Sequence, residues 1–189
     1  ILDDLGFPHE FLERELSELN ELFRGVYLIK ELTLRTLDYV MSFGERISCK
    51  LLAAVLAQRG IRAAGVDSYD LGFLTDSNYS VARPLPDTPR RIVEAMAARD
   101  EDVIVTTGFV GKNAAGEITT VGRQGSDFSA AYFGAALGAE EVQIWTDVDG
   151  ILTADPSVVA EARPLERMSF REAAELAYYG AEVLSLIHI

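Results

Sequence analysis

The stretch Gly122-Arg123-Gln124-Gly125-Ser126-Asp127 decides the fold, because it joins a strand pattern to a helix pattern. Upstream, the β-branched run Val103-Ile104-Val105-Thr106-Thr107 is typical of a buried strand. Downstream, residues 126–137 have the small-residue content of a helix packed closely on a sheet, with Ser126 as the expected N-cap and Gly138 as the expected stop. Strand, glycine turn and helix in this order predict an α/β fold.

A hairpin is predicted between the strand and the glycine turn. Residues 108–111 form a first glycine cluster, and the polar residues 112–117 form the tip of the hairpin. Residues 118–121 then lead back to a second glycine cluster, residues 122–125. This arrangement points backbone N–H groups and a helix N-terminus at one place, which favours an anion. Arg123 adds a fork of donors that suits a carboxylate or a phosphate. An exposed arginine in an ordinary turn is the alternative, but the neighbouring serine and aspartate favour a site.

A second strand-loop unit follows directly. Residues 141–145 alternate like a strand and run into Thr146-Asp147-Val148-Asp149-Gly150. Loops at the carboxyl ends of strands bind ligands in open α/β sheets, so Asp147 and Asp149 can orient a nucleotide or its Mg²⁺. The alternative interpretation is that Asp149-Gly150 is only a tight turn.

The remaining pattern predicts helices with a few short strands between them. Glycine is expected to end the first helix at Gly25, and a kink or a restart is expected at Gly44-Glu45 in the second. The expected elements are a helix over residues 8–24, a helical region from Thr33 to Arg59, a strand over residues 63–67, a helix opened by Thr88-Pro89, and a helix from Ser169 to about Tyr179 with Glu172 completing a capping box.

Composition excludes several classes of function. The chain has 189 residues, enough for one domain with a substantial core, and its net charge of −13 argues against nucleic-acid binding. The single cysteine, Cys49, is interpreted as a packing residue, and two histidines make a zinc cluster improbable. We see no signal peptide and no apolar run of membrane length, so we expect a cytoplasmic protein without membrane contact.

Several motifs in one order carry a resemblance to a known family. The chain resembles the aspartate kinases, within the amino-acid kinase family, over most of its length. The matching pieces are Ser42-Phe43-Gly44-Glu45-Arg46, Gly108-Phe109-Val110-Gly111, residues 119–127, residues 145–156 and Glu175-Leu176-Ala177-Tyr178-Tyr179-Gly180-Ala181.

The resemblance implies an incomplete three-layer α/β/α sandwich with a mostly parallel sheet. It implies transfer of the ATP γ-phosphoryl group to the side-chain carboxylate of L-aspartate, which gives 4-phospho-L-aspartate and opens lysine, methionine and threonine biosynthesis. ATP with its Mg²⁺ is the implied cofactor, no residue of the chain is assigned as a metal ligand, and the full-length parent is expected to be a homo-oligomer.

The resemblance also assigns roles to single residues. Arg123 is expected to bind the α-carboxylate of aspartate and Glu45 its α-ammonium group, while Phe109 lines the pocket and Gly125 and Ser126 help to hold the substrate.

Asp127 is the expected catalytic aspartate, which in the family orients a lysine beside the transferred phosphoryl group. The residues expected on the nucleotide side are Thr146, Asp147, Gly150, Leu152 and Ser157.

The chain departs from the family in two respects. Leu152, Ser157 and Glu182 stand where members often have tyrosine, arginine and lysine, which weakens the expected attraction for phosphate. The family's Lys-Phe-Gly-Gly motif is not found in residues 1–189, and the chain starts at Ile1. We therefore expect residues 1–184 to be a partial kinase domain, residues 185–189 to be a non-native tail, and the chain alone to be inactive.

Two other functions stay open at this point. A sibling kinase would act on glutamate, acetylglutamate or UMP, although the paired Phe-Gly-Glu-Arg and Gly-Arg-x-Gly-Ser-Asp motifs favour aspartate. A non-catalytic module would sense aspartate or a nucleotide without transferring phosphate. A P-loop kinase is excluded, because the chain has no Gly-x-x-x-x-Gly-Lys-Ser/Thr motif.

Overall fold

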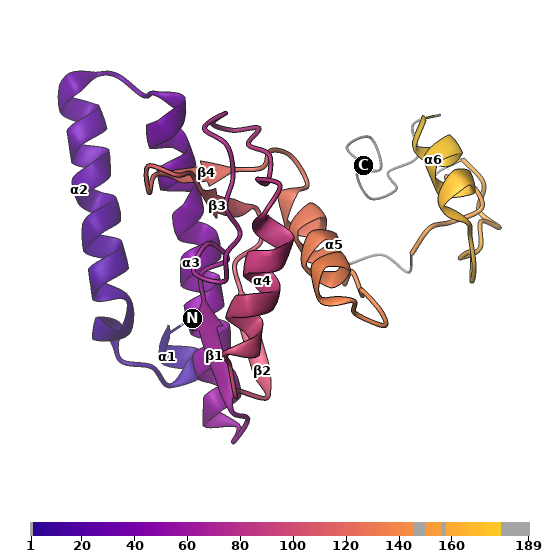
Figure 1. Cartoon of the computed structure of the whole chain (residues 1–189), viewed down its shortest axis with the longest axis horizontal. Coiled ribbons are helices and arrows are strands. Elements are labelled where there is room, and N and C mark those ends of the chain that lie inside the picture. Colours follow the sequence, from indigo (N-terminus) through magenta and orange to yellow (C-terminus); the bar gives the residue numbers. More distant parts are fainter. Residues whose placement is uncertain (1, 146–149, 156–157, 179–189) are drawn as a thin grey trace. The chain divides into compact units, whose positions relative to one another are not determined.

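The structure is a computed structural model that describes residues 2–145, 150–155 and 158–178 (Figure 1). The chain divides into two compact units, Ile1–Glu140 and Glu141–Ile189. The two units are described separately.

The first unit opens with helices. A short helix α1 (Leu2–Leu5) and a 3₁₀ turn η1 (His9–Leu12) precede α2 (Glu13–Ile29) and α3 (Leu34–Gln58). The Thr33 side chain caps α3 by accepting from the Thr36 amide at 3.2 Å.

Two predicted breaks in these helices are wrong. α2 continues through Gly25 and ends four residues later at Ile29, where the C-cap Lys30 has a left-handed backbone (φ 57°). α3 continues through Gly44 without a restart. A glycine inside a helix costs only about 1 kcal/mol, so a single glycine does not by itself end a helix. The helix end predicted at Arg59 is confirmed, since α3 ends at Gln58 with Arg59 as its C-cap.

The predicted strands 63–67 and 103–107 form a parallel pair. β1 (Ala63–Val66) pairs with β2 (Val103–Thr106) in the register Ala63↔Val103. The two faces of β1 meet different helices, as the two-residue period of a strand requires. A Cβ on Gly65 would lie 3.2 Å from Cβ of Ala53 on α3, whereas Val66 joins the core on the opposite face.

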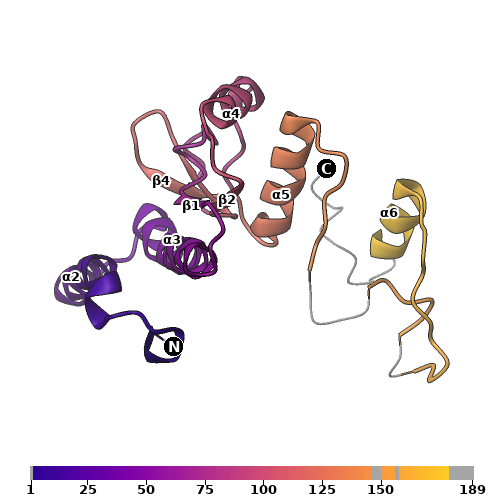
Figure 2. The same cartoon turned by 90° about the horizontal axis from the view of Figure 1, so that it is seen from below.

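Helices cover both faces of this pair, as Figure 2 shows. α3 lies on one face, and α4 (Thr88–Ala97) and α5 (Gly125–Leu137) lie on the other. The core between the strands and these two helices is built on a set of buried residues, Val66, Leu71, Phe73, Ile92 and Phe133. The predicted α/β/α arrangement with a parallel sheet is therefore confirmed.

Cys49 on α3 is a packing residue, as predicted. It is buried, and its thiol lies 3.0 Å from the Val105 carbonyl oxygen of β2. Burial raises the pKa of the Cys49 thiol, so the group is neutral.

The predicted hairpin is also confirmed. β3 (Val110–Lys112) pairs antiparallel with β4 (Ile118–Thr120), and residues 113–117 form the tip. The Asn113 side-chain oxygen accepts from the amides of Ala115 and Glu117, at 3.0 and 2.9 Å, which closes the turn.

The second unit contains the helix α6 (Phe170–Tyr178) and an isolated bridge between Leu152 and Pro164. The predicted capping box is confirmed, because the Ser169 amide donates to the Glu172 carboxylate at 2.8 Å and the Glu172 amide donates back to the Ser169 hydroxyl at 3.2 Å. The strand predicted over residues 141–145 is wrong, since no described residue pairs with it. An alternating pattern makes a strand only where a neighbouring edge accepts its hydrogen bonds. The predicted helix end near Tyr179 and the tail 185–189 lie outside the described residues.

No helix among the described residues is long and apolar enough to cross a membrane.

Candidate functional site

A hollow of about 450 Å³ lies at the N-terminus of α5. We call it the glycine-loop hollow. Its walls come from α3, the loop before β3, the end of β4 and the first turn of α5. It is lined by Leu37, Met41, Ser80, Phe109, Thr120, Gly122, Arg123, Gln124, Gly125, Ser126 and Asp127. Five of the six residues expected to serve aspartate and catalysis therefore line one hollow.

The backbone around this hollow is strained at several places. Ser80, Phe109 and Gln124 have φ values of 68°, 62° and 55°, in the left-handed region that side chains disfavour. They are three of the four described non-glycine residues with a positive φ, and all three line the hollow. Such conformations cost on the order of 1–3 kcal/mol each and gather at ligand sites, where the surrounding structure enforces them.

Two glycines allow the loop before β3 to approach the start of α5. A Cβ on Gly108 would lie 2.8 Å from Cα of Ser126, and a Cβ on Gly125 would lie 2.7 Å from Cδ2 of Phe109. The Ser129 hydroxyl joins the two segments, because it accepts from the Phe109 amide at 3.0 Å and donates to the Gly125 carbonyl at 2.7 Å. The glycine clusters thus bring segments from both ends of the hairpin into contact.

The start of α5 differs from the prediction. The N-cap is Gln124 rather than Ser126, and the Gly125 amide donates to the Gly122 carbonyl at 3.1 Å. The left-handed backbone at Gln124 turns the chain into the helix, so no capping side chain is needed there. Ser126 then lies in the first turn, where its amide and that of Asp127 have no acceptor among the described residues.

Ser126 does not cap the helix but links Glu45 to the site through a hydrogen bond. Its hydroxyl donates to the Glu45 carboxylate at 3.2 Å, across 81 residues of sequence. The unbroken α3 holds Glu45 in this position, so the predicted kink was not required for the glutamate to reach the site.

The hollow contains one cation and one anion. Arg123 is exposed, and Asp127, four residues further on, is half-buried. Neither side chain forms an ion pair or a hydrogen bond with a residue in the described part of the chain. The guanidinium group is therefore available to an external carboxylate.

Asp38 is a residue of the site that the sequence reasoning missed. Its carboxylate is fully buried and accepts four hydrogen bonds, from the amide and hydroxyl of Ser80 at 2.8 and 3.0 Å and from those of Thr120 at 2.9 and 2.8 Å. Both partners line the glycine-loop hollow. An aspartate four residues after Leu34, within an apolar stripe of a helix, was the signal in the sequence.

The five residues expected on the nucleotide side all belong to the second unit, which is described by itself. Thr146, Asp147 and Ser157 lie outside the described residues. Gly150, with φ 106°, and Leu152, which bridges to Pro164, belong to the second unit.

Comparison with known proteins gives one consistent result. A model of the amino acid kinase family matches residues 4–186. Aspartokinase 1, chloroplastic, of Arabidopsis thaliana is 43% identical over 89% of the chain and 30% of that protein. Aspartokinase 1 of Bacillus subtilis (strain 168) is 41% identical over 80% of the chain and 37% of that protein.

The structural comparison agrees with the sequence comparison. E. coli aspartokinase III, solved in complex with aspartate and ADP, superimposes with a TM-score of 0.85 at 35% identity, over 98% of this chain and 42% of that one. The same enzyme with lysine and aspartate gives a TM-score of 0.78. The chain thus spans less than half the length of the relatives that it matches.

Proposed function

The chain belongs to the amino acid kinase family, and from this premise we propose that the complete gene product containing it phosphorylates the side-chain carboxylate of L-aspartate with ATP. The observation that carries the proposal is the meeting of Arg123, Asp127 and the Glu45–Ser126 pair around the glycine-loop hollow.

These groups complement the three charged groups of aspartate. Arg123 binds the α-carboxylate through its two-pronged fork of donors, and Glu45 binds the α-ammonium group. Ser126 and the free amides of the first turn of α5 receive the side-chain carboxylate, where the helix N-terminus favours an anion. An uncharged or cationic substrate would leave Arg123 without a partner.

The chemistry requires mainly positioning and charge stabilisation. An oxygen of the aspartate side chain attacks the γ-phosphorus of ATP, the bond to the bridging oxygen breaks, and ADP leaves. Mg²⁺ enters with ATP as part of that substrate. Asp127 is an anion and cannot stabilise the transferred group directly, so it acts by orienting a cation, which in the family is a lysine.

For the nucleotide we propose contacts with Thr146, Asp147, Gly150, Leu152 and Ser157. Their support is the resemblance of residues 145–156 to the family and the similarity of the whole chain to an aspartokinase solved with ADP. We also propose a cytoplasmic location and assembly into a homo-oligomer. Several plant relatives are named as chloroplastic.

The test is to trap the acyl phosphate with hydroxylamine in the complete gene product and to measure aspartate-dependent hydroxamate. Asp127→Ala is expected to abolish the product, while Arg123→Ala raises KM for aspartate and leaves KM for ATP unchanged. Saturable aspartate binding that needs Arg123, without any hydroxamate, would mean that the protein senses aspartate and does not phosphorylate it. Activity with glutamate, acetylglutamate or UMP instead of aspartate would assign a sibling kinase.

A further inference from the structure

A second hollow, of about 500 Å³, lies between α2, α3 and the β3–β4 hairpin. It shares no lining residue with the glycine-loop hollow. We call it the cationic hollow, because four of its lining residues are cations and two are anions. These are Arg14, Arg35, Arg46 and Lys112, against Glu18 and Glu117. A lining with two surplus positive charges is unusual in a chain whose net charge is −13.

The two carboxylates of this hollow are already engaged. Glu117 accepts from Arg35 at 2.9 Å and from the Tyr79 hydroxyl at 2.5 Å, and Glu18 accepts from the Tyr39 hydroxyl. Glu117 is therefore paired with Arg35, whereas Glu18 forms no ion pair in the described part of the chain.

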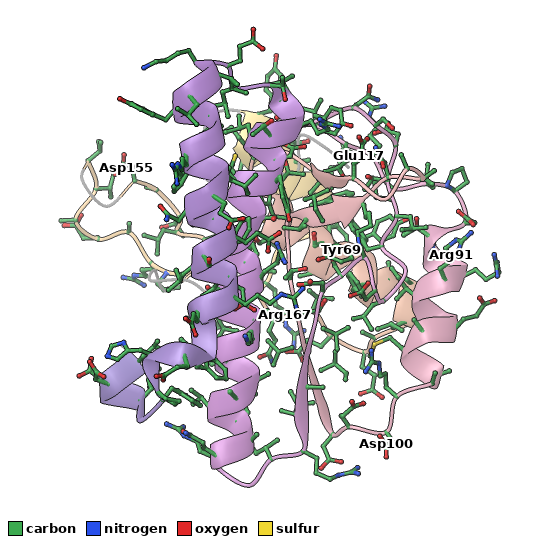
Figure 3. All side chains as sticks on the ribbon, turned by 90° about the vertical axis from the view of Figure 1, so that its left-hand side faces the viewer. Tyr69, Arg91, Asp100, Glu117, Asp155 and Arg167 are labelled. Atoms are coloured by element: carbon green, nitrogen blue, oxygen red, sulfur yellow. The ribbon has the colours of Figure 1, made fainter. Side chains whose placement is uncertain are left out.

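Two of the remaining cations, Lys112 and Arg14, form no ion pair in the described part of the chain. Lys112 places its ammonium 3.7 Å from the centre of the Tyr69 ring and forms no ion pair there, and Arg14 is likewise unpaired. Figure 3 views this side of the chain and labels Tyr69 and Glu117 next to the paired helices α2 and α3. A cation on a tyrosine face keeps most of its charge available to a further anion.

Arg46 adds a buried donor without an acceptor. Its side chain is only 20% exposed, and its Nη1 atom is buried with no hydrogen-bond partner, while Nε lies 3.7 Å from the Asp67 carboxylate. A buried donor left unpaired costs roughly 1–3 kcal/mol, and such groups in folded proteins call for an explanation such as a ligand.

We propose that the cationic hollow binds a small polyanion whose phosphate or carboxylate oxygens accept from Lys112, Arg14 and Arg46. The volume lies within the range of small-molecule sites, and the donors converge from two helices and one hairpin strand. Because α3 also forms a wall of the glycine-loop hollow, the two sites share one rigid element.

The test uses the reactivity of single lysines in the complete gene product. Lys112 and Lys30 form a matched pair, since each ammonium lies over a tyrosine ring, at 3.7 Å from Tyr69 and 4.4 Å from Tyr27. Acetylation by an amine-reactive ester is followed at both residues by peptide mass spectrometry, with and without pyrophosphate or citrate.

We expect either anion to slow acetylation of Lys112 at least fivefold and to leave Lys30 unchanged. Protection by pyrophosphate alone identifies a phosphate ligand, and protection by citrate alone identifies a carboxylate ligand. Equal rates at Lys112 with and without both anions would overturn the proposal.

Variants separate this site from the kinase site. Arg14→Gln should abolish the protection of Lys112, whereas Arg90→Gln, an exposed arginine on α4 paired with Glu94 at 2.6 Å, should preserve it. Arg123→Gln should also preserve it. Protection that survives Arg14→Gln but is lost in Arg123→Gln would mean that the anion acts from the glycine-loop hollow, which contradicts a second site.

Discussion

Asp38 on α3 and Thr120 at the end of β4 are joined by two hydrogen bonds, since the buried carboxylate accepts from the Thr120 amide at 2.9 Å and from its hydroxyl at 2.8 Å. The same carboxylate holds Ser80 in its left-handed conformation. A single side chain thereby ties a helix, a loop and a strand together beneath the glycine-loop hollow.

Asp38→Asn is expected to destabilise the fold and to weaken aspartate binding. The amide of asparagine replaces one acceptor by a donor, and each hydrogen bond to a charged group is worth roughly 1.5–3 kcal/mol. We expect the midpoint of thermal unfolding to fall by roughly 5–10 °C and KM for aspartate to rise more than KM for ATP. Asp102→Asn is the control, because that exposed carboxylate pairs with Arg62 on the surface. Equal effects of the two substitutions would contradict the positioning role of Asp38.

Gly125→Ala is expected to damage the aspartate site. The added methyl would lie 2.7 Å from Cδ2 of Phe109 and from Cγ2 of Val121, so the loop before β3 must move away from α5. Overpacking of this kind costs about 1–3 kcal/mol, which corresponds to a loss of roughly fivefold to 150-fold in kcat/KM if it falls on the transition state. Steady-state kinetics with aspartate measures this loss in kcat/KM. Unchanged kinetics would show that the close approach of Gly125 to Phe109 is not needed for activity.

Gly25→Ala is expected to stabilise the protein. Gly25 lies inside α2 rather than at its end, and a Cβ there would meet no atom within 4 Å. Alanine is favoured over glycine in a helix interior by roughly 0.5–1 kcal/mol. A higher midpoint of thermal unfolding with unchanged kcat is the expected result, and a lower midpoint would mean that this face of α2 is covered in the complete gene product.

Glu45 and Ser126 are expected to act as a coupled pair. If their 3.2 Å hydrogen bond positions the glutamate for the α-ammonium group, the effects of Glu45→Gln and Ser126→Ala on KM for aspartate should not add in the double variant. KM for ATP provides the internal control and should change little. Strictly additive effects would show that the two side chains serve the substrate independently.

The sequence predicted those features that depend on neighbouring residues. The strand predicted at 103–107, the hairpin with its tip predicted at 112–117 and the capping box of Ser169 and Glu172 all appear, although Lys112 belongs to β3 rather than to the tip. Each depends on backbone preferences and short-range hydrogen bonds, which a single sequence displays directly.

The failures arise where distant contacts decide the outcome. Residues 141–145 form no strand without a described partner. Gly25 and Gly44 are a different case, because a single glycine costs a helix only about 1 kcal/mol and does not end it. Asp38 was overlooked because its four donors come from residues 42 and 82 positions away. The pattern alone indicated a site at Arg123, Ser126 and Asp127, and the family resemblance assigned roles to all six residues expected to serve aspartate and catalysis. Five of the six line one hollow, and Glu45 reaches it through Ser126.

Glu117 is expected to titrate far below an ordinary glutamate. Hydrogen bonds from Tyr79, Asn113 and Arg35 lower its pKa from 4.5 to about 2. A carboxyl group whose pKa is lower in the folded state contributes stability above its unfolded value and loses that contribution as the pH falls through its folded value. The contribution of Glu117 should therefore be complete above about pH 4.5 and decline between there and pH 2.

Two measurements check this expectation. The ¹³C shift of the Glu117 carboxyl should titrate with a midpoint near 2, and Tyr79→Phe should move the midpoint towards 4.5, because the Tyr79 hydroxyl is the largest cause of the lowered pKa. The difference in thermal midpoint between the wild type and Glu117→Gln should be constant at neutral pH and shrink as the pH falls below about 4.5. Added salt should reduce only the part due to Arg35, since that ion pair is exposed. A wild-type midpoint near 4.5 would mean that these hydrogen bonds do not persist in solution.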